Sequence, residues 1–150
     1  MLVKRTRKAA MQRQVELAGE NLAGLVEAGL LMACADGELT DEEVDTVASV
    51  IDGFCDGRVT SRQIRDLMRT ALASIEAAGY DGTLEAMAQH LSLPEARELA
   101  LGCAAAVMVS DGEYAEGSED EAYYDMADTL EIDRDRADEI LDEVVGLYEG

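Results

Sequence analysis

Apolar residues recur along most of this chain at intervals of three and four residues, the spacing that puts side chains on one face of an α-helix. No segment alternates apolar and polar residues in the manner of a half-buried strand. The helical pattern covers seven segments, at residues 15–35, 44–54, 60–79, 82–91, 94–110, 123–130 and 137–148. It therefore predicts an all-α fold, a single-domain bundle of about seven helices.

Residues with known preferences for helix ends support several of these boundaries. Thr60 and Gln63 form a capping box at the start of the third segment, and Gly79 is placed to end it. The only proline, Pro94, suits the first turn of the fifth segment, where a missing N–H costs nothing.

Two of the predicted helices end in similar sequences, 75 residues apart. Leu-Met-Ala-Cys-Ala-Asp-Gly-Glu occupies residues 31–38, and Ala-Val-Met-Val-Ser-Asp-Gly-Glu occupies residues 106–113. Each is followed by a capping box that opens an acidic helix, although the second turn is about three residues longer. We expect an internal pseudo-twofold duplication, with the small-residue helices 20–35 and 95–110 packed closely at the centre.

Charge is distributed unevenly along the chain. The sequence holds 33 acidic and 12 basic residues, a net charge of −21, yet residues 1–13 carry five cations and no acid. This predicts a basic N-terminal arm at residues 1–13 and a helical domain at residues 14–150. The arm is either the frayed start of the first helix or a contact for anionic lipid or an acidic partner. The acidic excess excludes a general nucleic-acid binder, because affinity for phosphates depends on clustered cations.

Apolar runs and cysteines indicate the compartment. No apolar run reaches the roughly 18 residues that a membrane span requires, and we expect a protein without a secretory signal. Cys34, Cys55 and Cys103 are far apart and in no CxxC spacing, so they are interpreted as reduced core thiols. We expect a cytoplasmic protein that is not itself transmembrane.

The first acidic turn gathers five carboxylates in one bend: Asp36, Glu38, Asp41, Glu42 and Glu43. An acid at the C-terminal end of a helix meets the unfavourable end of the helix dipole, at roughly 0.3–1 kcal/mol, so Asp36 and Asp111 do not serve helix stability. A divalent cation would remove the conflict, because helix-end carbonyls and carboxylates supply the oxygen ligands that Ca²⁺ or Mg²⁺ prefers.

The spacing of the turn residues leaves a second interpretation open. Neither turn has the Gly and Glu positions of an EF-hand loop. In the simpler structural alternative, Asp forms an Asx-type turn, Gly supplies a positive φ, and the following acids favour the next helix N-terminus.

Catalytic signals are weak throughout. The single His90 has no Glu three residues before it, so a Glu-x-x-His di-iron site cannot be built. No phosphate-binding loop and no nucleophile motif is present. We expect a protein that is not an enzyme and that uses no organic cofactor.

These turns and the segments around them resemble the tellurite-resistance protein TerB family. Leu93-Pro94-Glu95-Ala96, the stretch from Val109 to Gly112, and residues 126–133 (Met-Ala-Asp-Thr-Leu-Glu-Ile-Asp) resemble the second half of that family, and the likeness covers residues 16–145. The resemblance implies an all-helical duplicated fold without known catalysis, a surface that holds divalent metal, and work beside a membrane-embedded partner in resistance to tellurite and other stresses.

Carried over by position, the family's turn acids correspond to Asp36 and Asp111. Its helix-start Glu corresponds to Glu43 in the first unit and to Glu119 or Glu121 in the second. We therefore expect a cytoplasmic stress-response adaptor, associated with a membrane through its partner. It would bind Ca²⁺, Mg²⁺ or Mn²⁺ through six carboxylates: Asp36, Glu38, Glu43, Asp111, Glu113 and Glu119. The alternative is an acidic interaction module that docks a basic partner without metal.

Overall fold

The computed structural model describes residues 19–34, 40–55, 59–110 and 118–149, and these residues form α-helices with no strand among them. The helices are α2 (Gly19–Ala33), α3 (Asp41–Cys55), α4 (Ser61–His90), α5 (Pro94–Ser110), α6 (Ser118–Thr129) and α7 (Arg134–Glu149). The predicted all-α class is confirmed for this part of the chain. The predicted basic arm at residues 1–13 lies outside it.

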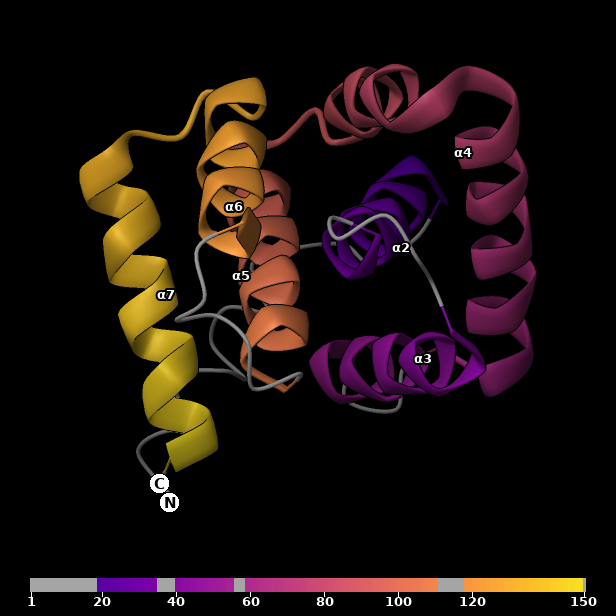
Figure 1. Ribbon diagram of the computed structural model, residues 1–150, viewed down its shortest axis with the longest axis horizontal. Coiled ribbons are helices and arrows are strands. Elements are labelled where there is room, and N and C mark those ends of the chain that lie inside the picture. The colour runs from indigo at the N-terminus through magenta and orange to yellow at the C-terminus, as the bar shows by residue number, and fades with distance from the viewer. Residues whose placement is uncertain (1–18, 35–39, 56–58, 111–117, 150) are drawn as a thin grey trace.

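Helices α2 and α5 form the centre of the molecule and pack directly against each other. Figure 1 shows α2 nearly end-on and α5 running down the view, so the two helices cross steeply. Helices α3 and α4 lie against α2, whereas α6 and α7 lie against α5. The expected close packing of the two small-residue helices is therefore present.

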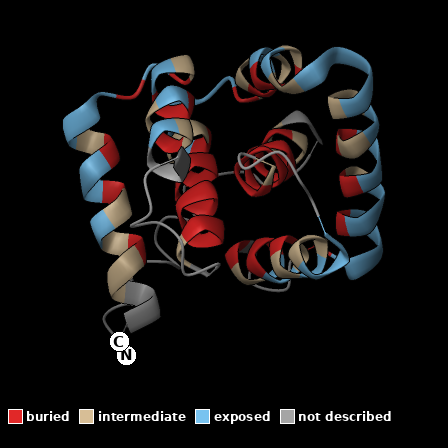
Figure 2. Cartoon of the chain, viewed as in Figure 1, coloured by how far each residue is buried: buried red, intermediate tan, exposed pale blue. Residues whose placement is uncertain are grey.

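The extent of burial also distinguishes the central helices α2 and α5 from the helices around them. Every residue of 24–33 in α2 and of 99–108 in α5 is buried, whereas α4 and α7 bury one side only (Figure 2). A helix that is apolar all round must be surrounded by other elements, which explains the central position of α5. None of the helices in the described ranges has the length and apolar character that crossing a bilayer would require.

Helix α4 joins two helices that the sequence pattern separates. The predicted capping box at its start is confirmed: Thr60 Oγ1 accepts from the Gln63 amide at 3.1 Å, and Gln63 Oε1 accepts from the Thr60 amide at 3.0 Å. Gly79, predicted to end this helix, adopts φ 79° and ψ 177° and bends it instead (Figure 1). The described part of the chain thus holds six helices, and the internal duplication stays a prediction.

The turn between α6 and α7 is closed by a Schellman motif. Glu131 takes a left-handed conformation at φ 59°, and the amides of Ile132 and Glu131 donate to the carbonyls of Ala127 and Asp128 at 2.8 and 3.0 Å. The fully buried Tyr123 then donates its hydroxyl to the Ala137 carbonyl at 2.6 Å, and burial raises the pKa of this phenol. These bonds hold α7 in a fixed position beside α6.

Candidate functional site

Of the six predicted metal ligands, the structure describes the side chain of Glu43 alone. Asp36, Glu38, Asp111 and Glu113 lie outside the described residues, and Glu119 lies in α6 without a described side chain. Glu43 is described, and its carboxylate closes the capping box at the start of α3. Its Oε1 accepts from the Thr40 amide at 3.0 Å and from the Thr40 hydroxyl at 3.2 Å. One oxygen of Glu43 is therefore committed to the helix start.

The described residues do not assemble a metal centre on their own. Over residues 19–34, 40–55, 59–110 and 118–149, no group of three or more His, Cys, Asp and Glu side chains is arranged to hold an ion. A cation held by three or more such side chains would need at least one ligand from outside these described residues.

The end of α2, from which the first acidic turn departs, lies beside polar groups of α4 and α6. The Tyr80 hydroxyl is buried and has no hydrogen-bond partner among the described residues. Burial raises the pKa of Tyr80, and Asp125, the Cys34 thiol and Asp81 raise it further, so these groups lie near its hydroxyl. The chain at Cys34, directly after α2, therefore lies next to polar atoms as well as apolar core.

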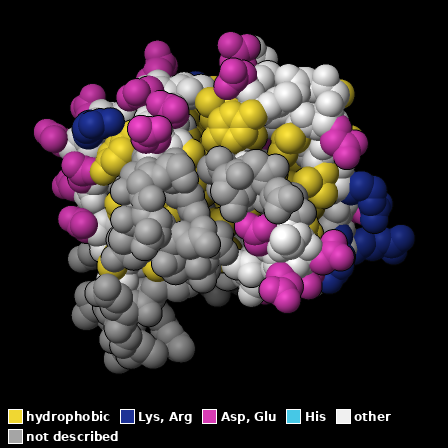
Figure 3. Space-filling view, in the orientation of Figure 1, with side chains coloured by type: hydrophobic (Ala, Val, Ile, Leu, Met, Phe, Trp, Pro, Cys, Tyr) yellow, Lys and Arg dark blue, Asp and Glu magenta, His cyan; other side chains and the backbone are white. Residues whose placement is uncertain are grey.

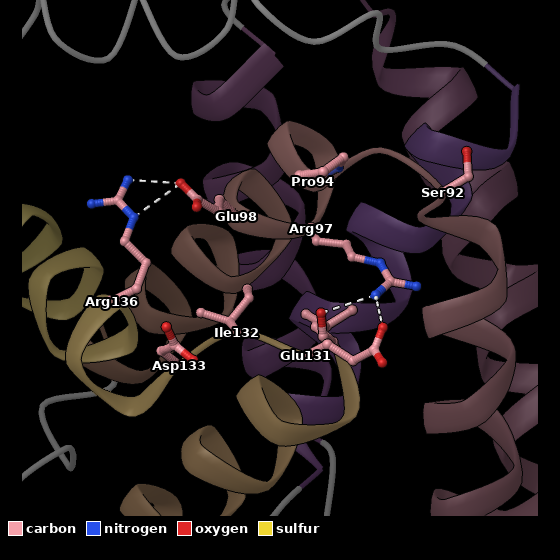
Figure 4. Close-up of a pocket in the computed structure, with 9 residues that line it drawn as sticks. Ser92, Pro94, Arg97, Glu98, Glu131, Ile132, Asp133 and Arg136 are labelled. Carbon is pink, nitrogen blue, oxygen red and sulfur yellow. Dashed lines mark hydrogen bonds and ion pairs between the residues drawn. The ribbon is translucent and has the colours of Figure 1, made fainter.

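A pocket of about 470 Å³ opens where the α4–α5 connection meets the α6–α7 turn (Figure 4). Its walls combine two guanidinium groups and three carboxylates with apolar side chains. The lining residues are Ser92, Pro94, Arg97, Glu98, Leu130, Glu131, Ile132, Asp133 and Arg136.

Arg97 ties together the ends of two helices at this pocket. Its Nε and Nη2 donate to the carbonyls of Leu91 and Ala88 at 2.6 and 3.2 Å, at the end of α4. Its Nη1 donates to the Leu130 carbonyl at 3.0 Å, after α6, and to Glu131 at 3.2 Å. The last carbonyls of a helix have no partner within the helix, so Arg97 satisfies three otherwise orphaned acceptors.

The second guanidinium of the pocket is also engaged. Arg136 donates from Nη2 and Nε to one oxygen of Glu98, at 2.7 and 3.1 Å (Figure 4). This hydrogen bond raises the pKa of Arg136. Because both cations already hold protein acceptors, the pocket is built as a structural joint between α4, α5, α6 and α7.

A hydrogen bond between Glu27 and His90 joins α2 to the end of α4. The carboxylate Oε1 of Glu27 lies 2.7 Å from His90 Nδ1, and their side chains are 7% and 34% exposed. Burial is the largest effect on the Glu27 carboxyl and raises its pKa, while the hydrogen bond and charge of His90 act in the opposite direction. His90 therefore supplies the partner that keeps a carboxylate inside the core.

Sequence reasoning does not find these contacts. Glu27 and His90 are 63 residues apart, and no spacing rule links them. The acceptors of Arg97 are backbone carbonyls, which leave no mark in residue type. The one available signal is that Glu27 interrupts an otherwise apolar helix face.

Comparison with models of known families, with curated proteins and with solved structures gives no match for this chain. Its function is therefore inferred from its own residues and their arrangement.

Proposed function

We propose that this chain is an adaptor of the TerB type that binds divalent cations at its two acidic turns. One observation carries the proposal: the burial of the central helices repeats at the offset of the sequence repeat. Residues 24–33 and 99–108 are buried without interruption, and Cys34 and Val109, which follow them, are both half-buried. These stretches are 75 residues apart, as are Asp36 and Asp111.

The positions of the turns support cation binding. Helix α5 ends at Ser110, directly before Asp111, and α2 ends at Ala33, three residues before Asp36. Each turn thus follows a buried helix whose last carbonyls have no partner within the helix and whose dipole places partial negative charge there. Carbonyl and carboxylate oxygens together are the ligands that Ca²⁺, Mg²⁺ and Mn²⁺ favour.

Family membership, location and partner belong to the same proposal. The buried central pair supports a TerB-type fold, together with the Pro94-Glu95-Ala96 helix start and the segment at residues 126–133. A TerB-type chain would act in the cytoplasm without catalysis, beside a membrane-embedded partner in the response to tellurite and other stresses.

A second candidate function is a metal-independent interaction module. Figure 3 shows many acidic side chains along the edge formed by α6 and α7, and others on the opposite side of the view beside the arginines of α4. The exposed acids of α6 and α7 are Glu121, Asp125, Asp128, Asp135, Asp138, Glu139 and Asp142. Such an edge fits a basic protein surface by charge alone, and electrostatic attraction of this kind accelerates encounter.

Thermal melts with Ca²⁺, Mg²⁺, Mn²⁺ or chelator at constant ionic strength distinguish the two functions. Because a cation bound only by the folded state stabilises it by mass action, about 2.7 kcal/mol is expected at 100 times the dissociation constant. For a chain of this size this is a rise in Tm of roughly 5–10 °C. The rise is expected to disappear in the double variant Asp36→Asn, Asp111→Asn.

The matched control removes two charges elsewhere. Glu76 and Glu85 are exposed on α4, so the variant Glu76→Gln, Glu85→Gln is expected to keep the full shift. The metal proposal would be rejected if every divalent ion raised Tm equally and the Asp36→Asn, Asp111→Asn variant showed the same rise. General screening of charge would then explain the result.

A further inference from the structure

Glu27 is an exception in the core. Among the acidic and basic residues that the structure describes, it alone is buried, in the middle of the central helix α2. A buried carboxylate is costly unless it is hydrogen-bonded and paired with a positive charge. Its partner His90 is the last residue of α4 and reaches solvent with about a third of its side chain, so the pair can exchange protons with water.

Helices α3, α4, α5 and α6, which pack against α2, carry other titratable groups that are not fully exposed, and none of these is among the groups that shift the pKa of Glu27. In α3, the Glu43 carboxylate caps its own helix. In α5, Arg97 donates to helix-end carbonyls and Glu98 accepts from Arg136. In α6, Tyr123 and Tyr124 donate to Ala137 and Asp138. Cys103 of α5 lies beside Gly29, and Tyr80 of α4 lies near Cys34 and Asp125. The charge that acts on the Glu27 carboxyl is that of His90.

The pair sits where the chain turns from α4 into α5. We call residues 91–93 the α4–α5 corner. Leu91 packs against Gly24, one helical turn before Glu27 on α2, and Arg97 holds the carbonyls of Ala88 and Leu91. Next to it, Leu93 is 44% exposed, the only large apolar side chain exposed in the described part of the chain. The hydrogen bond between Glu27 and His90 is thus one of three contacts that fix this corner.

We propose that Glu27 and His90 form a proton-dependent latch that fastens the α4–α5 corner to α2 and weakens as pH rises. Imidazole groups change charge between about pH 5 and 8. While the imidazole is charged, the buried carboxylate has a counter-charge 2.7 Å away. When the imidazole is neutral, the carboxylate keeps a hydrogen bond but has no positive partner, which favours opening of the contact.

The raised pKa of Glu27 acts in the same direction. A carboxyl that holds its proton more tightly in the folded state than in the unfolded state favours folding at low pH. The resulting contribution to the free energy of unfolding is fully present below the ordinary pKa of Glu. It is lost as pH rises through the raised pKa that Glu27 has in the folded protein. Loss of the carboxyl proton and loss of a positive partner therefore both weaken the latch as pH rises.

Hydrogen–deuterium exchange on the full chain, corrected for the chemical exchange rate at each pH, tests the latch. Between about pH 6 and pH 8.5, protection of the amides in residues 84–97 is expected to fall about tenfold, as when a buried charged hydrogen bond loses strength. Protection in α7 is expected to change less than about twofold. Unchanged protection of residues 84–97 in the wild type would overturn the proposal without any variant.

Glu27→Gln keeps a hydrogen-bonding side chain but removes the charge, so its residues 84–97 are expected to stay protected at the higher pH. Glu85→Gln removes the same charge from an exposed position of α4 and is expected to behave like the wild type. If protection of residues 84–97 in Glu27→Gln falls with pH as it does in the wild type, groups other than Glu27 cause the opening and the proposal is rejected. If Glu27→Gln does not fold, His90→Gln is measured instead. A tenfold fall in the protection of residues 84–97 in His90→Gln would reject the latch.

Discussion

Replacing Arg97 with alanine is expected to lower the free energy of unfolding by about 3 kcal/mol. The truncation removes the donors of three helix-end carbonyls, those of Ala88, Leu91 and Leu130. A partly buried acceptor without a donor costs about 1–3 kcal/mol. Water that enters the open pocket offsets part of the combined cost of the three carbonyls. Denaturation by urea at neutral pH measures the change.

Two further variants distinguish the hydrogen bonds of the Arg97 guanidinium from the effect of its positive charge. Arg97→Lys keeps the cation but has one nitrogen in place of the planar fork, so it is expected to recover less than half of the loss. Arg62 is exposed on α4, and Arg62→Ala is expected to change stability by less than about 0.5 kcal/mol. Equal stability of Arg97→Ala and the wild type would mean that water replaces the guanidinium completely.

Replacing Leu91 with alanine is expected to cost about 3 kcal/mol, the usual range for deleting a fully buried leucine side chain. Gly24→Ala disturbs the same contact from the other side. A Cβ at Gly24 would lie 2.5 Å from Leu91 Cγ, and overpacking of this kind costs about 1–3 kcal/mol, partly offset by the better helix propensity of alanine.

The double variant identifies the contact. In Gly24→Ala, Leu91→Ala the new methyl group enters the space left by leucine, so the combined loss is expected to be smaller than the sum of the single losses by about 1 kcal/mol or more. A Cβ at Gly146 in α7 would meet no atom within 4 Å, so Gly146→Ala is expected to stabilise the protein slightly. Strict additivity would show that Leu91 does not rest on Gly24.

The helices follow from the sequence because their signals are local. Apolar residues at intervals of three and four, the Thr60–Gln63 capping box and Pro94 each act within one or two turns of their own helix. Gly79 shows the limit of such reasoning: its left-handed backbone is predictable, but whether the chain stops or bends there depends on tertiary packing. The sequence pattern therefore predicts the positions of the helices better than their continuity.

The contacts between helices are less accessible to sequence reasoning. The partner of His90 is 63 residues away on another helix, and the acceptors of Arg97 are backbone atoms. For the candidate site, Glu43 has two interpretations in the sequence, a metal ligand and a helix cap, and the structure gives one of its oxygens to the cap. The turn acids Asp36, Glu38, Asp111 and Glu113, together with Glu119, stay predictions based on oxygen-ligand chemistry.

Metal analysis of the protein, purified without added divalent ions or chelator, tests the proposed function most directly. About one to two equivalents of divalent metal are predicted to remain bound to the wild type and to Glu76→Gln, Glu85→Gln. The variant Asp36→Asn, Asp111→Asn is predicted to retain far less. Wild-type protein without metal, or equal metal in the two double variants, would contradict cation binding at the acidic turns.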